Sequence, residues 1–178
     1  MNIDRTLVII DMQDSFICCG DEEELIPAIC KLCHHAKQNK WPIILVEFNA
    51  SGRTTSAILE AVENYPFTET VTKETGSGGK EVMACLLHHP EWPLNLLVCG
   101  IYGPECVAET VAGLLDNSDL VEVDVIIDAI YPPYCSLAEL DEHGQQREGE
   151  FFVSEIVDPE YLAQYETVNS LPKKIVLS

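Results

Sequence analysis

Basic residues are scarce in this sequence. Its 178 residues include 10 Lys and Arg against 30 Asp and Glu, which gives a formal net charge of −20. Nucleic acids and anionic membrane surfaces bind basic patches on proteins, so this excess of acidic residues argues against both as partners. It says nothing about the fold or the class of enzyme. The partner we expect is a small-molecule substrate.

Long apolar runs are also missing. No stretch approaches the roughly 20 apolar residues that a membrane-spanning helix needs. Residues 1–5 lack the basic, apolar and cleavage regions of a signal peptide. These features predict a cytoplasmic protein, in which the eight cysteines are reduced thiols rather than disulfides.

Two nucleotide-binding motifs are absent. The first predicted strand is followed by Asp11-Met-Gln-Asp14, where a dinucleotide fold would have Gly-x-Gly-x-x-Gly. A phosphate-binding loop fails at Glu74 and Glu81. Cys30 and Cys33 have the spacing of a haem attachment or a redox pair, but they lie within a predicted amphipathic helix. We therefore predict no cofactor.

Apolar runs alternate with helical patterns along the whole chain, which predicts a parallel sheet with helices on both faces. The expected fold class is α/β, a three-layer αβα Rossmann-like fold with a mainly parallel six-stranded sheet, in a single domain over residues 1–178. The predicted strands are 5–11, 42–48, 67–73, 94–99, 120–128 and 151–157. The predicted helices are 20–40, 56–63, 80–89, 104–116, 136–148 and 158–166, with a last extended piece at 174–177.

Polar residues follow or end three of these strands. Asp11 and Lys73 each end a strand, and Cys106 lies just beyond another, in the first turn of a helix that Pro104 begins. Ligands bind at the carboxyl ends of the strands in such sheets, so we expect the three side chains to converge. A nearby ammonium and a helix N-terminus favour thiolate, so we expect a Cys106 pKa in the range of about 3.5–7.5. A thiolate nucleophile with an adjacent base is the arrangement of a covalent hydrolase.

The lysine has a second candidate in Lys80. We prefer Lys73, because it ends a strand whereas Lys80 begins a helix. The segment between them, residues 74–79, contains three glycines and is expected to be a flexible loop.

Three stretches resemble the isochorismatase-like cysteine hydrolases, which include nicotinamidases and N-carbamoylsarcosine amidases. They are Leu7-Val-Ile-Ile-Asp-Met-Gln-Asp-Ser-Phe16, then Lys73 with Ser77, then Gly100-Ile-Tyr-Gly-Pro-Glu-Cys-Val107 with Thr110. The resemblance covers residues 6–129. It implies a catalytic triad of Asp11, Lys73 and Cys106.

The same resemblance implies further features of the site. A cis peptide bond between Ile101 and Tyr102 lies four residues before the nucleophile. By the same resemblance, the N–H groups of Tyr102 and Cys106 are expected to form the oxyanion hole. For the hydrolase we also expect Phe16 and Tyr102 to line the substrate pocket.

The chain also departs from parts of this family. Nicotinamidases bind a metal with Asp and His beside the second strand, but Glu47-Phe-Asn-Ala-Ser-Gly-Arg53 contains no His, so we predict no metal. Isochorismate-cleaving members lack the cysteine. The aromatic residue that usually follows Ser77 is replaced by Gly78.

These features predict a cysteine hydrolase that cleaves a small amide or related C–N substrate through a thioester on Cys106. The alternative is a noncatalytic protein that keeps the scaffold for binding a partner. Family resemblance further predicts a homo-oligomer.

Overall fold

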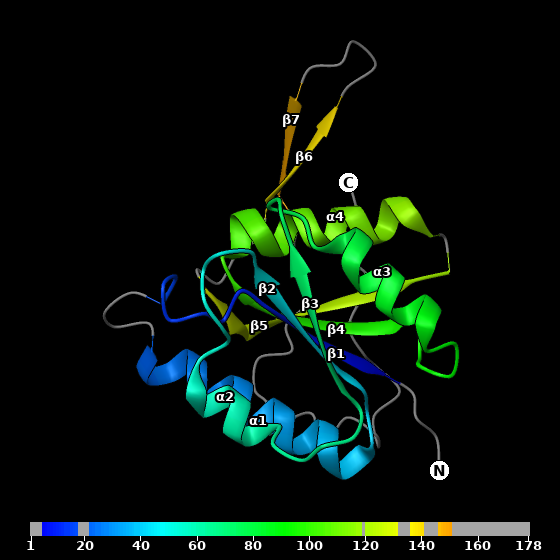
Figure 1. Cartoon of the computed structure of the whole chain (residues 1–178). Helices are drawn as coiled ribbons and strands as arrows, with labels where there is room; N and C mark the ends of the chain where they lie inside the picture. The colour runs from blue at the N-terminus through cyan, green and yellow to red at the C-terminus, as the bar shows by residue number, and fades with distance from the viewer. Residues whose placement is uncertain (1–4, 18–21, 119, 132–135, 141–145, 151–178) are drawn as a thin grey trace.

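The computed structural model describes residues 5–17, 22–118, 120–131, 136–140 and 146–150 (Figure 1). The strands of its main sheet are β1 (Thr6–Ile10), β2 (Ile43–Phe48), β3 (Thr68–Lys73), β4 (Asn95–Ile101) and β5 (Glu122–Tyr131). The helices are α1 (Glu22–Asn39), α2 (Ser56–Ala61), α3 (Gly79–His88), α4 (Ala108–Asn117) and the π-helical turn η1 (Gly103–Val107). Within these described ranges, no helix has both the length and the apolar character to cross a membrane.

The sheet has the strand order β3-β2-β1-β4-β5, and each neighbouring pair is parallel. Helices α1 and α2 cover one face, and α3 and α4 cover the other (Figure 1). The predicted α/β class, with a mainly parallel sheet between helical layers, is confirmed. The predicted elements at 151–157, 158–166 and 174–177 lie outside the described residues.

Strand β1 illustrates why the sheet is buried on both faces. All of its residues are buried. Leu7 and Ile9 pack in the apolar cluster that includes residues of α1 and α2, whereas Val8 and Ile10 pack in the cluster that includes residues of α3 and α4. Successive side chains of a strand point to opposite faces, so a strand between two helical layers needs a continuous aliphatic run.

The prediction of a helix over residues 136–148 is wrong. Strands β6 (Ser136–Leu140) and β7 (Gln146–Glu150) pair there as an antiparallel hairpin, which projects from the body near α4 (Figure 1). The spacing of Leu137 and Leu140 fits one face of a helix, but a short apolar pattern does not separate helix from strand. Pairing between the two halves of the segment decides the outcome here.

The carboxyl ends of β1, β3 and β4 lie at the same edge of the sheet, because the strands are parallel. Gly100 brings the end of β4 close to the end of β1. It has a φ of 122°, and a Cβ atom at this position would lie 2.1 Å from the carbonyl oxygen of Ile10. Only glycine fits this approach, which sets the turn after β4 beside Asp11.

Candidate active site

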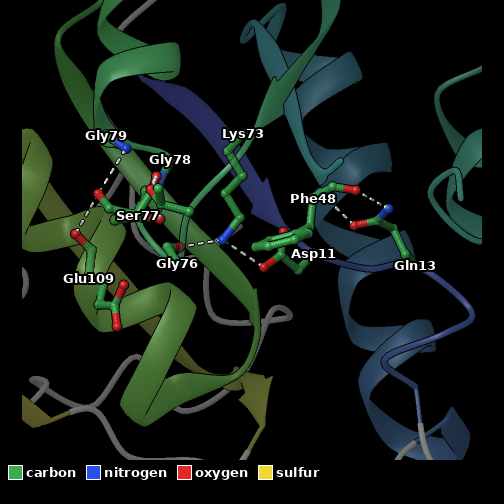
Figure 2. A network of polar contacts seen from close by, with 11 residues as sticks. Asp11, Gln13, Phe48, Lys73, Gly76, Ser77, Gly78, Gly79 and Glu109 are labelled. Carbon is green, nitrogen blue, oxygen red and sulfur yellow. Dashed lines mark hydrogen bonds and ion pairs between the residues drawn. The ribbon is translucent and has the colours of Figure 1, made fainter. Parts of the chain in front are cut away.

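Asp11 and Lys73 form a buried ion pair at this edge (Figure 2). The Nζ atom of Lys73 lies 2.8 Å from Oδ2 of Asp11, and the two side chains are 0% and 2% exposed. The structure therefore brings these two predicted residues together. Lys80, the other candidate, is exposed at the start of α3.

The backbone after β1 aims the Asp11 side chain into this pair. Asp11 has a φ of 53°, in the left-handed region, and its N–H donates to the carbonyl of Val46 at 2.9 Å. Its own carbonyl accepts the N–H of Gln13 at 2.7 Å. The chain thus leaves the sheet in a tight turn immediately at Asp11, whose left-handed conformation Asp tolerates better than most residues.

Gln13 is a site residue that the sequence did not reveal. Its side chain is fully buried, and its amide accepts the N–H of Phe48 at 2.7 Å and donates to the Phe48 carbonyl at 3.0 Å (Figure 2). A further bond to the carbonyl of Gly52 measures 2.6 Å. Gln13 therefore fixes the end of β2 against the turn after β1. A single sequence does not indicate that a glutamine side chain is buried and hydrogen-bonded to the backbone of a distant segment.

The position of Phe48 determines the surroundings of Lys73. The Lys73 Nζ lies 5.5 Å from the centre of the Phe48 ring, within cation–π distance. It also donates to the carbonyl of Gly76. The ammonium is thus held by a carboxylate, a carbonyl and an aromatic face, and these contacts offset the cost of burying its charge.

Cys106 lies in η1, half-buried, between β4 and α4. Its side chain interacts with both Asp11 and Lys73. All three predicted residues therefore meet at one edge of the sheet. They come from the ends of β1 and β3 and from the turn after β4.

The expected low pKa of Cys106 is wrong. Burial raises the pKa of the thiol to about 11, and the Asp11 carboxylate beside it adds to the rise, against the opposing effect of the Lys73 charge. The expectation of a low pKa rested on the Lys73 ammonium and the helix N-terminus, and both burial of the thiol and the Asp11 carboxylate oppose them. At neutral pH Cys106 is therefore a thiol, and it would need a base to act as a nucleophile.

Asp11 has the properties of such a base. Burial raises the pKa of its carboxyl above the ordinary value of 3.8, while contact with Lys73 and with Cys106 lowers it. A base is most effective when its pKa lies near the working pH, so desolvation makes this carboxylate more basic while Lys73 favours its ionised form. The two effects together suit proton transfer from the neighbouring thiol.

The peptide bond between Ile101 and Tyr102 is cis, which confirms the predicted position. The carbonyl of Tyr102 accepts the N–H groups of Glu105 and Val107, at 3.2 Å and 3.0 Å. These bonds organise η1 around Cys106. The oxyanion-hole role of the Tyr102 and Cys106 N–H groups stays a prediction.

Aromatic side chains gather beside the triad. The Tyr102 hydroxyl donates to the carbonyl of Phe16 at 2.7 Å. The Phe16 ring meets Phe48 edge to face, with ring centres 6.1 Å apart. This arrangement joins the two predicted pocket residues, Phe16 and Tyr102, to Phe48, the aromatic residue that covers Lys73.

Residues 47–53, the segment in which we predicted no metal ligands, contain a carboxylate that is hydrogen-bonded within the loop. The Glu47 carboxylate accepts the backbone N–H of Thr54 at 2.7 Å and its hydroxyl at 2.9 Å. Among the residues that the structure describes, no three His, Cys, Asp or Glu side chains are grouped to hold a metal ion. The absence of a metal stays a prediction.

Comparison with known proteins identifies the family. The sequence matches the family model of the isochorismatase domain over residues 5–143, most of its length. The chain belongs to the isochorismatase family. No curated protein sequence matches it.

Solved structures of the same fold include three with described activities. MAR1 ribonuclease from Caenorhabditis elegans superposes with a TM-score of 0.59 at 23% identity over 72% of this chain; the chain spans 65% of that protein. The nicotinamidase of Staphylococcus aureus has a TM-score of 0.61 at 13% identity, over 72% of this chain and 83% of its own. N-carbamoylsarcosine amidase from Thermoplasma acidophilum has a TM-score of 0.61 at 15% identity, over 79% and 87%. At these sequence identities, the similarity to the three structures shows a shared fold and not a shared activity.

Proposed function

We propose that this protein is a cysteine hydrolase that cleaves a small amide or a related C–N substrate. The observation that carries the proposal is the meeting of the half-buried Cys106 with the buried Asp11–Lys73 pair at one edge of the sheet. Thiol, carboxylate and ammonium in contact are the groups that covalent amide hydrolysis requires. Membership of the isochorismatase family and the fold shared with two amidases support the same class.

In the first half of the reaction, the Cys106 sulfur attacks the carbonyl carbon of the amide as its proton passes to Asp11. The carbonyl oxygen becomes an oxyanion, which the N–H groups of Tyr102 and Cys106 stabilise. Protonated Asp11 then gives its proton to the nitrogen as the C–N bond breaks. The amine departs and a thioester remains on Cys106.

In the second half, Asp11 takes a proton from water, and the resulting hydroxide attacks the thioester. The C–S bond breaks, the thiolate regains its proton from Asp11, and the carboxylic acid leaves. Lys73 takes no part in these proton transfers. Its part is to keep the Asp11 carboxylate ionised before each proton transfer and to hold its position.

A panel of small amides and ureides tests this proposal, with the Cys106→Ala variant as control. We expect ammonia or amine release by the wild-type protein from at least one panel member and none from the variant. Equal turnover by both proteins would exclude Cys106 as nucleophile. No turnover of any member by the wild-type protein would favour the noncatalytic alternative.

Other expectations from the sequence stay proposals. They are the single domain over residues 1–178, the cytoplasmic location, the homo-oligomer and the absence of a cofactor. The oligomeric state is directly measurable by sedimentation of the purified chain.

A further inference from the structure

The loop that follows Lys73 packs directly against the helix that follows Cys106. We call residues 74–79 the lysine loop. Its glycines predicted flexibility, but it is hydrogen-bonded to α4 at more than one point. Figure 2 shows one of these bonds, between Ser77 and Glu109. This loop also carries Gly76, whose carbonyl accepts the Lys73 ammonium.

The central contact is made by Thr110. Its hydroxyl oxygen accepts the backbone N–H of Gly78 at 2.9 Å, and the bond is buried. Thr110 itself is fully buried, although it is polar. It stands four residues after Cys106, so it lies about one helical turn along the chain from the nucleophile.

A second contact flanks the first. The Ser77 hydroxyl donates to the carbonyl of Glu109 at 2.9 Å, and it accepts the N–H of Gly79 at 3.3 Å (Figure 2). Two successive loop residues therefore bond two successive residues of α4. A loop with paired contacts of this kind has one position relative to the helix rather than many.

Glycines make this close approach sterically possible. A Cβ atom on Gly79 would lie 2.6 Å from the backbone carbon of Gly113 in α4. A Cβ atom on Gly78 would lie 2.8 Å from the side chain of Val46. A larger residue at position 79 would push the loop away from α4, and one at position 78 would clash with β2. The replacement of the family's aromatic residue by Gly78 thus goes with a tightly packed loop.

These contacts form one continuous path between two members of the triad. It runs from the nucleophile's helix through Thr110 to Gly78, back along the loop to Gly76, and from its carbonyl to Lys73. We infer that Thr110 is a positioning residue, which fixes the lysine loop on α4 and thereby sets the place of Lys73 beside Asp11 and Cys106. Its importance for catalysis rests on the proposed function, but its effect on the site does not.

The test compares Thr110→Val with Thr110→Ser. Valine keeps the volume and removes the acceptor, whereas serine keeps the acceptor. The readout is the rate at which iodoacetamide labels Cys106 at a fixed pH below the thiol pKa, followed by mass spectrometry of the Cys106 peptide. Lys73 favours the thiolate, so displacing it raises the thiol pKa, and each unit of that rise slows labelling about tenfold. We expect a fall of several-fold to about tenfold in Thr110→Val and near wild-type labelling in Thr110→Ser.

Thr6→Val is the matched control. Thr6 is also fully buried, and its hydroxyl donates a hydrogen bond to the carbonyl of Pro93 at 2.9 Å. It lies at the opposite edge of the sheet from Thr110. We expect this variant to lose stability without slower labelling. If Thr110→Val does not fold, Ser77→Ala removes the flanking bond and is expected to slow labelling by a smaller factor.

Labelling needs no substrate, so the inference and the proposed function fail separately. Unchanged labelling in folded Thr110→Val, or an equal slowing in Thr6→Val, would overturn the positioning role. Slower labelling in a protein that hydrolyses no amide would leave the positioning role intact and contradict the hydrolase. If the wild-type protein is an amidase, kcat in Thr110→Val falls and KM stays close to its original value.

Discussion

Two ion pairs connect the strands of the sheet at its opposite edges. At the amino edge, Arg5 lies 3.0 Å from Asp124, and both side chains are 13% exposed. At the carboxyl edge, Lys73 lies 2.8 Å from Asp11, and the exposed fractions are 0% and 2%. Burial raises the pKa of both aspartates, although a cation beside each lowers it. A perturbed carboxylate therefore does not by itself identify the functional edge.

The third group makes the difference between the two pairs. Cys106 interacts with the pair at the carboxyl edge. The backbone next to this pair is irregular at the left-handed Asp11 and at the turn η1. The amino edge has no such group among the interactions that shift the pKa of Asp124, which come from Arg5 and Glu122. In the proposed mechanism only the pair at the carboxyl edge acts on a nucleophile.

The largest expected difference between the two ion pairs is in catalytic activity. Asp11→Asn removes the base and is expected to lower kcat about 10²–10⁴-fold. Asp124→Asn makes the same chemical change at the other edge and should leave kcat unchanged. Steady-state rates on an amide from the panel measure both. A similar loss of kcat in the two folded variants would assign the effect to stability instead of chemistry.

The next largest difference between the two ion pairs is expected in the free energy of unfolding. Lys73→Met leaves the buried Asp11 charge without its partner and is expected to cost about 3–5 kcal/mol at neutral pH. Arg5→Met acts on the more exposed pair and should cost less, because water reaches Asp124. Urea denaturation of both variants gives the two values, and a larger loss in Arg5→Met would contradict the ranking.

The pH dependence of that loss has a definite sign. In Lys73→Met the folded pKa of Asp11 rises further above its ordinary value of 3.8, because the cation that lowered it is gone. The penalty is complete above the raised folded pKa, shrinks as the pH falls below it, and vanishes below 3.8. Denaturation at several pH values should therefore show the variant approaching the wild-type protein in acid.

Packing at the carboxyl edge gives a smaller effect. Gly79→Ala places a methyl group against the backbone of Gly113, and we expect it to cost about 1–3 kcal/mol and to slow the labelling of Cys106. The exposed Gly52 has no atom near its would-be Cβ, but its φ of 85° strains any side chain, so it is not a suitable control. Ala112→Gly, next to Gly113, changes α4 without adding an atom between it and the lysine loop and serves as the control instead.

The smallest effect concerns the thiol itself. Asp11 raises the pKa of Cys106, so Asp11→Asn should lower it and speed iodoacetamide labelling at neutral pH by about threefold or more. Asp124→Asn should not change the rate. Subtracting the labelling of Cys106→Ala isolates this cysteine from the other seven.

Much of this picture could be predicted from the sequence, for identifiable reasons. Strands buried on both faces have continuous aliphatic runs, so β1, β2 and β4 were recognisable. The positions of Asp11 and Lys73 at strand ends followed from the same runs. Chain order alone then placed Cys106 at the same edge.

The missing parts depend on contacts between distant residues. Burial and the neighbouring Asp11 carboxylate raise the pKa of Cys106, and both depend on how distant segments pack around the thiol. Gln13 and Thr110 bond to backbone groups of other segments, and no local pattern reveals such bonds. The hairpin of β6 and β7 likewise depends on pairing between its two halves.

The central claim is that Cys106 is the nucleophile, with Asp11 as its base. The most direct measurement is acid quenching of the wild-type protein during turnover of an amide or ester, followed by peptide mass spectrometry. We expect an acyl group bound to the Cys106 peptide, absent in Cys106→Ala and much reduced in Asp11→Asn. Turnover with no acyl group on Cys106, and undiminished in Cys106→Ala, would contradict it.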